Sequence, residues 1–192
     1  MARGMKIIAL VTGTLFVVAL ALQFILINDT LLSITITLGV VFYHFAMRLF
    51  VGTGIDLIFH NEIDYKRACF KEKRFEKRLY SILRVRKWAK KVPTYDSDTF
   101  SPKKHSWEEI LKATCQSEIV HKTIIALSLL PILLIIPFGT PLVFILTSIC
   151  SALFDATFVI VQRYNRPKLL AHVEKLNSRG AKTTLLDKNI TK

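Results

Sequence analysis

The hydrophobic positions of this chain fall into four long apolar runs. They extend over Ile7–Ile27, Leu31–Phe50, Ile119–Phe138 and Pro141–Val161. Each run is close to the roughly 20 residues that an α-helix needs to cross the hydrocarbon layer of a membrane. Only a few residues separate the first run from the second, and the third from the fourth, so each pair must lie antiparallel and adjacent. The pattern predicts an all-α fold, an integral membrane four-helix bundle that forms a single domain over residues 1–192.

Residues 51–118 are the one large polar segment, and their apolar positions predict helices. From Tyr65 to Val85, apolar residues form a broken stripe among many cations, which is typical of an amphipathic helix on a membrane surface. A solvated helix packed against the bundle fits the same pattern. Farther along, Ser106 and Glu109 have the spacing of a capping box, so a helix should begin at Trp107 and continue into the third run.

The charge distribution predicts how the chain crosses the membrane. The formal net charge is +13, with fifteen Lys and Arg residues in Gly52–Glu118, eight from Gln162 onwards, and none in the two short turns. By the positive-inside rule, both termini, the loop 51–118 and the tail 162–192 should be cytoplasmic. Membrane topology accounts for these cations without a nucleic acid partner, and the basic surface should attract anionic phospholipids.

The first apolar run also has features of a cleaved signal peptide. Ala19-Leu20-Ala21 follows a basic start and an apolar core, as a signal-peptidase site would. The apolar stretch nevertheless continues through Ile27, and the second run follows at once. An uncleaved membrane helix is therefore the simpler interpretation.

Several titratable residues lie within or at the ends of the apolar runs, where a charge costs about 2.5–3.5 kcal/mol and needs a partner or a function. His44 and Arg48 are four residues apart and share one helix face, although Arg48 could also simply extend to the headgroups. Glu118 and His121 are three apart. A carboxylate beside an imidazole can raise its basicity for removing a proton from a hydroxyl, and the same pair would also fit a plain interfacial hydrogen bond.

The fourth run contains Asp155 and ends in a polar hexapeptide, Gln162-Arg163-Tyr164-Asn165-Arg166-Pro167. Cations are common at this end of a membrane helix. Arg163 and Arg166 are also spaced to bind one phosphate or carboxylate, with Asn165 able to hydrogen-bond an acyl carbonyl or a sugar hydroxyl. Six polar residues lie at the same depth, in the inner half of the bundle: His44, Arg48, Glu118, His121, Asp155 and Arg163. This shared depth predicts a polar pocket that opens to the cytoplasm.

A Glu-x-x-His pair also occurs in di-iron helical bundles. Those sites need a second such pair and further carboxylates, which this sequence lacks. Neither a metal site nor a cofactor is therefore expected.

Three motifs carry a resemblance to a known family: Arg86-Lys87-Trp88; Glu118-Ile119-Val120-His121 followed by Leu130-Pro131; and Val161-Gln162-Arg163-Tyr164-Asn165-Arg166-Pro167. They resemble the glycosyl-diaponeurosporenoate acyltransferase family of bacterial membrane proteins, which esterify a fatty acyl chain onto the sugar of a carotenoid glycoside. The resemblance covers about Tyr80–Leu170, and its last motif is the most specific. It departs at Ala89 and Lys168, and the first two helices show no clear match.

The resemblance implies that His121 is the catalytic base, with Glu118 as its orienting partner, and that Arg163, Asn165 and Arg166 contact the substrate. Further substrate contacts are expected from Gln162, Tyr164, Arg48, His44 and Trp88. The predicted function is a membrane-embedded acyltransferase in the bacterial cell membrane. The acyl donor would be an acyl thioester or a phospholipid, and the acceptor a hydroxyl of a lipid-like molecule such as a carotenoid glycoside. The alternatives are a non-enzymatic lipid-binding scaffold and a small transporter.

Overall fold

The computed structural model describes residues 2–92 and 98–190, and all secondary structure within these ranges is helical. Two hairpins form the bundle. The first consists of α1 (Ala2–Leu26) and α2 (Asp29–Phe59); the second consists of α5 (Trp107–Ser128), η3 (Leu130–Leu134), α6 (Ile135–Phe138) and α7 (Pro141–Ile190). Between the hairpins lie η1 (Ala68–Phe70), α3 (Arg74–Ile82), α4 (Val85–Trp88) and η2 (Ala89–Lys91).

Four helical stretches in the described residues are long and apolar enough to cross a membrane. They are Arg3–Leu26, Asp29–Phe59, Trp107–Phe138 and Pro141–Arg179. The predicted all-α fold with four apolar helices is therefore confirmed. The third stretch is not one regular helix, because Pro131 lies in the first turn of η3, where its missing N–H is tolerated.

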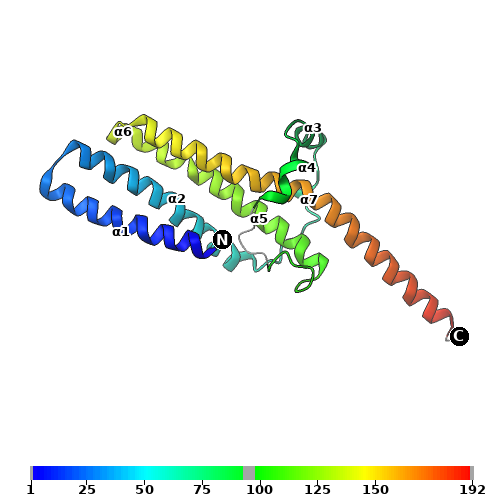
Figure 1. The fold of residues 1–192 in the computed structure, drawn as a ribbon. Coiled ribbons are helices and arrows are strands. Elements are labelled where there is room, and N and C mark those ends of the chain that lie inside the picture. Colours follow the sequence, from blue (N-terminus) through cyan, green and yellow to red (C-terminus); the bar gives the residue numbers. More distant parts are fainter. Residues whose placement is uncertain (1, 93–97, 191–192) are drawn as a thin grey trace.

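The two hairpin turns lie at the same end of the bundle (Figure 1). At the opposite end α2 stops at Phe59 and α5 starts at Trp107, and we call this the polar end. Helix α7 extends beyond the polar end towards the C-terminus, and α3 and α4 lie beside it where it leaves the bundle (Figure 1). The described residues between the hairpins therefore gather at one end of the molecule (Figure 1).

Side-chain caps define the starts of two long helices. Before α2, the Asn28 side chain accepts hydrogen bonds from the backbone N–H groups of Thr30 and Leu31, at 2.9 and 3.1 Å. Before α5, Ser106 and Glu109 form the predicted capping box, in which each side chain accepts from the other residue's backbone N–H. The predicted helix start at Trp107 is therefore confirmed, and α5 carries Glu118 and His121 on one continuous helix.

Helices α1 and α2 pack through two reciprocal pairs of glycine and phenylalanine. A Cβ atom on Gly13 would lie 2.8 Å from the ring of Phe42, and one on Gly39 would lie 2.8 Å from the ring of Phe16. Real Cβ atoms do not approach other atoms this closely. Small residues let helices approach each other within a membrane, where packing rather than the hydrophobic effect drives association.

The segment predicted as one amphipathic helix over Tyr65–Val85 is shorter in the structure. Its α-helix is α3, Arg74–Ile82, preceded by the short turn η1 and by non-helical backbone. Glu76 and Tyr80 are buried, while Phe75 and Ile82 on other faces of α3 are exposed. The buried face agrees with the alternative of a helix packed on the bundle.

Two helices also continue into segments that were predicted as loop or tail. Helix α2 passes Phe50 and ends at Phe59, and α7 continues through Pro167 to Ile190. The last two residues of the predicted tail, 191–192, lie outside the described residues.

Candidate active site

A histidine and an aspartate meet where α5 packs against α7, each 14 residues after the first residue of its helix. Nδ1 of His121 lies 2.8 Å from Oδ1 of Asp155, whose side chain is 1% exposed. The His121 ring also stacks on Phe158, with ring centroids 4.5 Å apart and an angle of 6° between the planes. The aspartate and the aromatic ring together fix the orientation of the imidazole.

Arg48 of α2 completes this cluster. Its Nε and Nη2 atoms donate to Oδ2 of Asp155, at 3.1 and 2.5 Å, and Nη2 also donates to Oγ of Ser151 at 2.8 Å. Nη1 donates to the carbonyl of His44. Asp155 therefore has a cation on one oxygen and an imidazole on the other, which offsets the cost of a charge within a spanning helix.

The imidazole borders a cavity of about 520 Å³, within the range of small-molecule sites. Its lining combines the apolar side chains of Ile124, Phe154 and Phe158 with polar groups that include Arg48 and Asp155. Among the described residues, none hydrogen-bonds Nε2 of His121. In the tautomer whose Nδ1–H donates to Asp155, Nε2 carries the lone pair and can accept a proton from a bound group.

A hydrogen-bonded bridge between α2 and α5 borders the same cavity. The Gln116 amide donates to Oδ1 of Asp56 at 2.9 Å and accepts from the backbone N–H of Asn61 at 2.7 Å. All three residues line the cavity. The bridge holds the C-terminal end of α2 against α5 and thereby supports the wall that carries Arg48.

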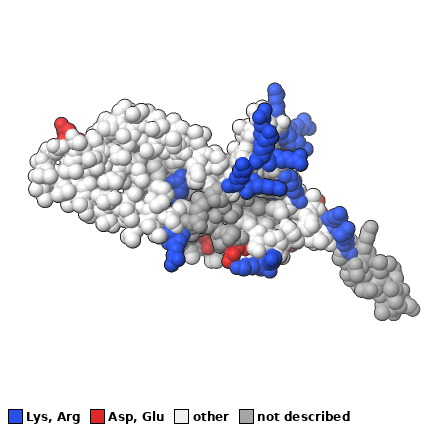
Figure 2. All heavy atoms as spheres, viewed as in Figure 1, with Lys and Arg blue, Asp and Glu red and all other residues white. Residues whose placement is uncertain are grey.

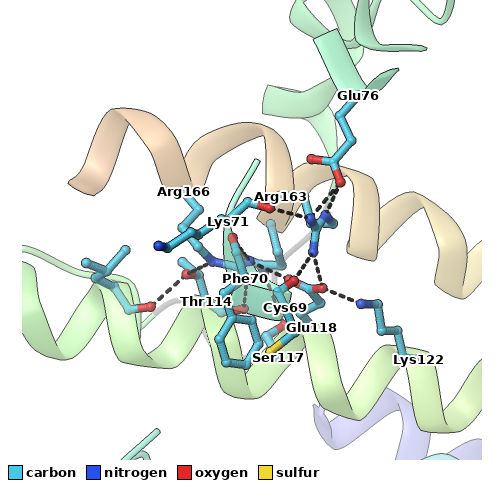
Figure 3. Close-up of polar contacts among 12 residues, drawn as sticks. Cys69, Phe70, Lys71, Glu76, Thr114, Ser117, Glu118, Lys122, Arg163 and Arg166 are labelled. Atoms are coloured by element: carbon cyan, nitrogen blue, oxygen red, sulfur yellow. Dashed lines mark hydrogen bonds and ion pairs between the residues drawn. The ribbon is translucent and has the colours of Figure 1, made fainter. Parts of the chain in front are cut away.

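Glu118 belongs to a second polar cluster (Figure 3). It is fully buried, and its carboxylate contacts Arg163 at 2.6 Å and Arg166 and Lys122 at 2.5 Å. Arg163 also contacts Glu76 of α3, at 2.6 Å. The carboxylate on His121 is thus Asp155, and not Glu118 as the sequence suggested. Glu118 and His121 are only three residues apart, but the two arginines of α7 engage Glu118.

The two arginines of this cluster hold the backbone that precedes α3. Arg163 donates to the carbonyls of Cys69 and Lys71, each at 3.0 Å, and Arg166 donates to the carbonyl of Phe70 at 3.3 Å (Figure 3). Arg166 also donates to the side chain and carbonyl of Thr114 on α5. Both guanidinium groups therefore join α7, α5 and the segment 69–71.

The remaining predicted site residues do not line the His121 cavity. Gln162 donates to Oγ of Ser117 at 3.1 Å, Tyr164 packs edge-on against Tyr80, and Trp88 donates to the carbonyl of Leu83. Asn165 is half-buried. His44 is buried, and neither of its ring nitrogens has a hydrogen-bond partner in the described part of the chain. Of the ten predicted residues, His121 and Arg48 line the cavity.

Sequence reasoning missed two carboxylate roles. Asp155 was noted as a charge in the fourth span but was not paired with His121, although an acid in that position needs a partner such as Arg48. Glu76 was overlooked, and its only signal is that it interrupts a run of cations. No group of His, Cys, Asp and Glu side chains in the described ranges is placed to hold a metal ion.

Comparison with known proteins connects this site to a family. The chain matches the sequence model of the family described as glycosyl-4,4'-diaponeurosporenoate acyltransferase over residues 66–175, which confirms the resemblance predicted over Tyr80–Leu170. The match contains Glu118, His121, Asp155, Arg163 and Arg166, but not Arg48. Neither curated proteins nor solved structures give a match. The matched family supports an acyltransferase of carotenoid biosynthesis. Because the match spans more than half of the 192 residues, the chain belongs to the glycosyl-4,4'-diaponeurosporenoate acyltransferase family.

Proposed function

We propose that this protein transfers a fatty acyl group to a hydroxyl of a lipid-like acceptor, such as a carotenoid glycoside, in the His121 cavity. The polar end would face the cytoplasm of a bacterial cell, since it carries the basic segments of the chain. The family supports acyl transfer. The identity of the acceptor and the side of the membrane belong to the proposal.

The observation that carries the proposal is the contact between His121 and Asp155 at the wall of the cavity. A histidine whose Nδ1–H is held by a buried carboxylate is oriented to act as a general base through Nε2. Such a base contributes about 10²–10⁴-fold to a rate. Arg48 donates to the second oxygen of Asp155, so the first oxygen remains directed at Nδ1 and can stabilise the imidazolium that forms.

The proposed reaction needs no group beyond the acyl donor, the acceptor hydroxyl and His121. Nε2 removes the proton of the acceptor hydroxyl while that oxygen attacks the acyl carbonyl carbon. The tetrahedral intermediate then expels the thiol or alcohol of the donor, which receives the proton from Nε2. The same sequence serves an acyl thioester and a phospholipid donor. An ester of the acceptor is the product in both cases.

The cavity wall supports a lipid-like substrate. Phe154 lines the cavity and is 46% exposed on the apolar part of α7, so one aromatic side chain borders both the cavity and the lipid-facing surface. Val120, Ile124 and Phe158 extend the apolar lining next to His121. An acyl chain or polyene could thus lie against apolar side chains while its polar end reaches the imidazole.

We assign Arg163 and Arg166 to positioning the polar end rather than to substrate contact. The Arg163 guanidinium uses Nε, Nη1 and Nη2 in contacts with Glu76, Glu118 and two backbone carbonyls. It is also buried. A substrate phosphate or carboxylate would have to displace these partners. Their proposed role is to hold segment 69–71 and α3 against α5 and α7.

The test is lipid mass spectrometry of a bacterium that makes the glycoside acceptor. Cells carrying wild-type protein should contain a species heavier than the acceptor by one fatty acid less one water. His121→Ala should remove this species at equal protein level in the membrane. The matched control is His60→Asn, because His60 is an exposed histidine whose left-handed backbone conformation asparagine tolerates. Identical lipid profiles for wild-type and empty-vector cells, or undiminished product with His121→Ala, would contradict the proposal.

A further inference from the structure

A second pocket, of about 500 Å³, lies between α7 and the turn that joins α3 to α4. It shares no lining residue with the His121 cavity. Five cations and one carboxylate are among its lining residues: Lys77, Arg84, Arg86, Lys87, Lys168 and Glu72. Figure 2 shows Lys and Arg side chains concentrated over this part of the molecule, whereas the surface of the apolar bundle is almost free of charge.

Among the described residues, one of these five cations has an acidic partner: Lys77 lies 3.7 Å from Glu72. No described carboxylate pairs with the other four, Arg84, Arg86, Lys87 and Lys168. Like charges this close in sequence repel each other unless an anion lies between them. Arg163 and Arg166 nearby are, by contrast, compensated by Glu76 and Glu118. The pocket therefore has an excess of positive charge that the described side chains do not neutralise.

The turn that presents these cations is held in a defined conformation. Arg84 has φ 48° and ψ 41°, the left-handed region that residues other than glycine rarely adopt. The Trp88 indole N–H donates to the carbonyl of Leu83 at 2.8 Å, and the Val85 side chain is fully buried. A strained residue is maintained only where its surroundings over-determine it, as at a binding site. The cations are therefore presented by a fixed turn.

Two tyrosines line the pocket, one from α3 and one from α7. Tyr80 and Tyr164 pack edge to face with ring centroids 5.4 Å apart, and Nζ of Lys168 lies 3.6 Å from the Tyr164 ring centroid. The Tyr80 hydroxyl donates to Glu76 at 3.1 Å, so the pair of tyrosines connects to the Arg163 cluster. Aromatic contact restricts Lys168, and its ammonium lines the same pocket as Arg84, Arg86 and Lys87.

We propose that this pocket binds the phosphate group of an anionic phospholipid headgroup. Arginine forks and lysine ammonium groups suit phosphate oxygens, which a phospholipid or a soluble phosphate ester could supply. The lipid is favoured because Ile82 and Leu83, between the lining residues Ser81 and Arg84, are 67% and 40% exposed. These apolar side chains can contact acyl chains while the neighbouring cations bind the headgroup.

The pocket is distinct from the proposed reaction site and does not depend on it. On α7 its residues Tyr164 and Lys168 follow Asp155 by nine and thirteen positions, which at 100° per residue places them on a different face from Asp155. A lipid bound here would anchor α3 and α4 beside α7. Phospholipid binding in this pocket can therefore be tested independently of acyl transfer.

The experiment measures lipid binding to the purified full-length protein by native mass spectrometry. The probes are phosphatidylglycerol and phosphatidylcholine with identical acyl chains, and coenzyme A as a soluble phosphate ester. The test variant is Arg84→Gln/Arg86→Gln/Lys87→Gln. The matched control, Arg67→Gln/Lys103→Gln/Lys175→Gln, removes three exposed cations that do not line the pocket. If the test variant does not fold, Arg86→Gln/Lys87→Gln replaces it.

Wild-type protein and the control should bind phosphatidylglycerol more tightly than phosphatidylcholine. The test variant should bind phosphatidylglycerol at least about tenfold more weakly than wild type does, because each well-placed cation contributes to headgroup affinity. An equal loss in the control would show general surface attraction and would overturn the assignment. So would unchanged phosphatidylglycerol binding by the test variant, or a loss of coenzyme A binding in that variant without a loss of phosphatidylglycerol binding.

Discussion

Asp155 and His121 are 34 positions apart in the sequence, yet Oδ1 of Asp155 lies 2.8 Å from Nδ1 of His121. The imidazole comes from α5, the carboxylate from α7, and the cation on the other carboxylate oxygen from α2. Three membrane helices must therefore pack correctly before the candidate base is oriented. Changes to this arrangement should affect acyl transfer and helix packing in different proportions.

Asp155→Asn should reduce the rate of acyl transfer at least about 100-fold. The amide keeps the shape of the side chain but no longer stabilises an imidazolium, and it can hold the wrong histidine tautomer. The reduction should fall on kcat, with little change in the KM for the acceptor, because the base acts in the transition state. Initial rates in reconstituted membranes measure this. Leu153→Ala, an exposed neighbour on α7, should retain the wild-type rate, and equal rates for wild type and Asp155→Asn would refute the role.

Arg163→Gln should destabilise the fold by about 3–5 kcal/mol, because it leaves Glu118 and Glu76 buried without one of their cations. Glu118→Gln should have a similar effect, since it removes the shared partner of Arg163 and Arg166. The double variant should lose less free energy of unfolding than the two single variants lose in sum, because the second change removes a charge that the first left unpaired. Equilibrium unfolding in mixed micelles provides the three values. Strict additivity would show that the pair does not couple.

The elements that the sequence predicts correctly are those fixed by local patterns. Apolar runs long enough to span a membrane identified the four helices, and the side chains of Ser106 and Glu109 determined where α5 begins. The amphipathic pattern over Tyr65–Val85 predicted too much helix. Carbonyls of Cys69, Phe70 and Lys71 bond to Arg163 and Arg166 of α7, and such tertiary contacts compete with local helix formation.

The candidate site shows the same division between local and distant information. His121 and Arg48 were predicted as site residues from the cost of polar groups in a span, and both line the cavity. The carboxylate partner of His121 could not be derived from the sequence. Glu118 lies three residues from His121 on the same helix, and Asp155 lies at the same depth on another helix, so both were possible partners. Only the packing of α7 on α5 decides between them, with Arg163 and Arg166 placed to bind Glu118.

Gly39→Ala should destabilise the hairpin of α1 and α2. The added methyl would meet the Phe16 ring at 2.8 Å, so the two helices must separate or the ring must move. Phe16→Leu combined with Gly39→Ala should recover part of the loss by making room for the methyl. Gly54→Ala is the matched control, because a methyl group there would meet nothing within 4 Å beyond its own stretch of helix. Unfolding midpoints in detergent should rank Gly54→Ala above Gly39→Ala, and the reverse order would contradict the packing.

Alkaline pH should weaken the fold through Tyr80. Burial, with the negative charge of Glu76, raises the pKa of Tyr80, so the folded protein holds this proton more tightly than the unfolded chain does. The resulting stabilisation is complete below the unfolded pKa of about 10 and is lost as the pH rises above it. Unfolding midpoints between pH 9 and about 11.5 should therefore fall more steeply for wild type than for Tyr80→Phe. Parallel slopes would show that Tyr80 does not contribute.

The most direct test of the account is the rate of ester formation by the purified protein in nanodiscs, with a long-chain alkyl glucoside as acceptor and an acyl thioester as donor. Wild-type protein should form the acyl glucoside, and His121→Gln should form it at least about 100-fold more slowly while folding and binding acceptor normally. Ester formation by His121→Gln at the wild-type rate would contradict the assignment of His121 as the base.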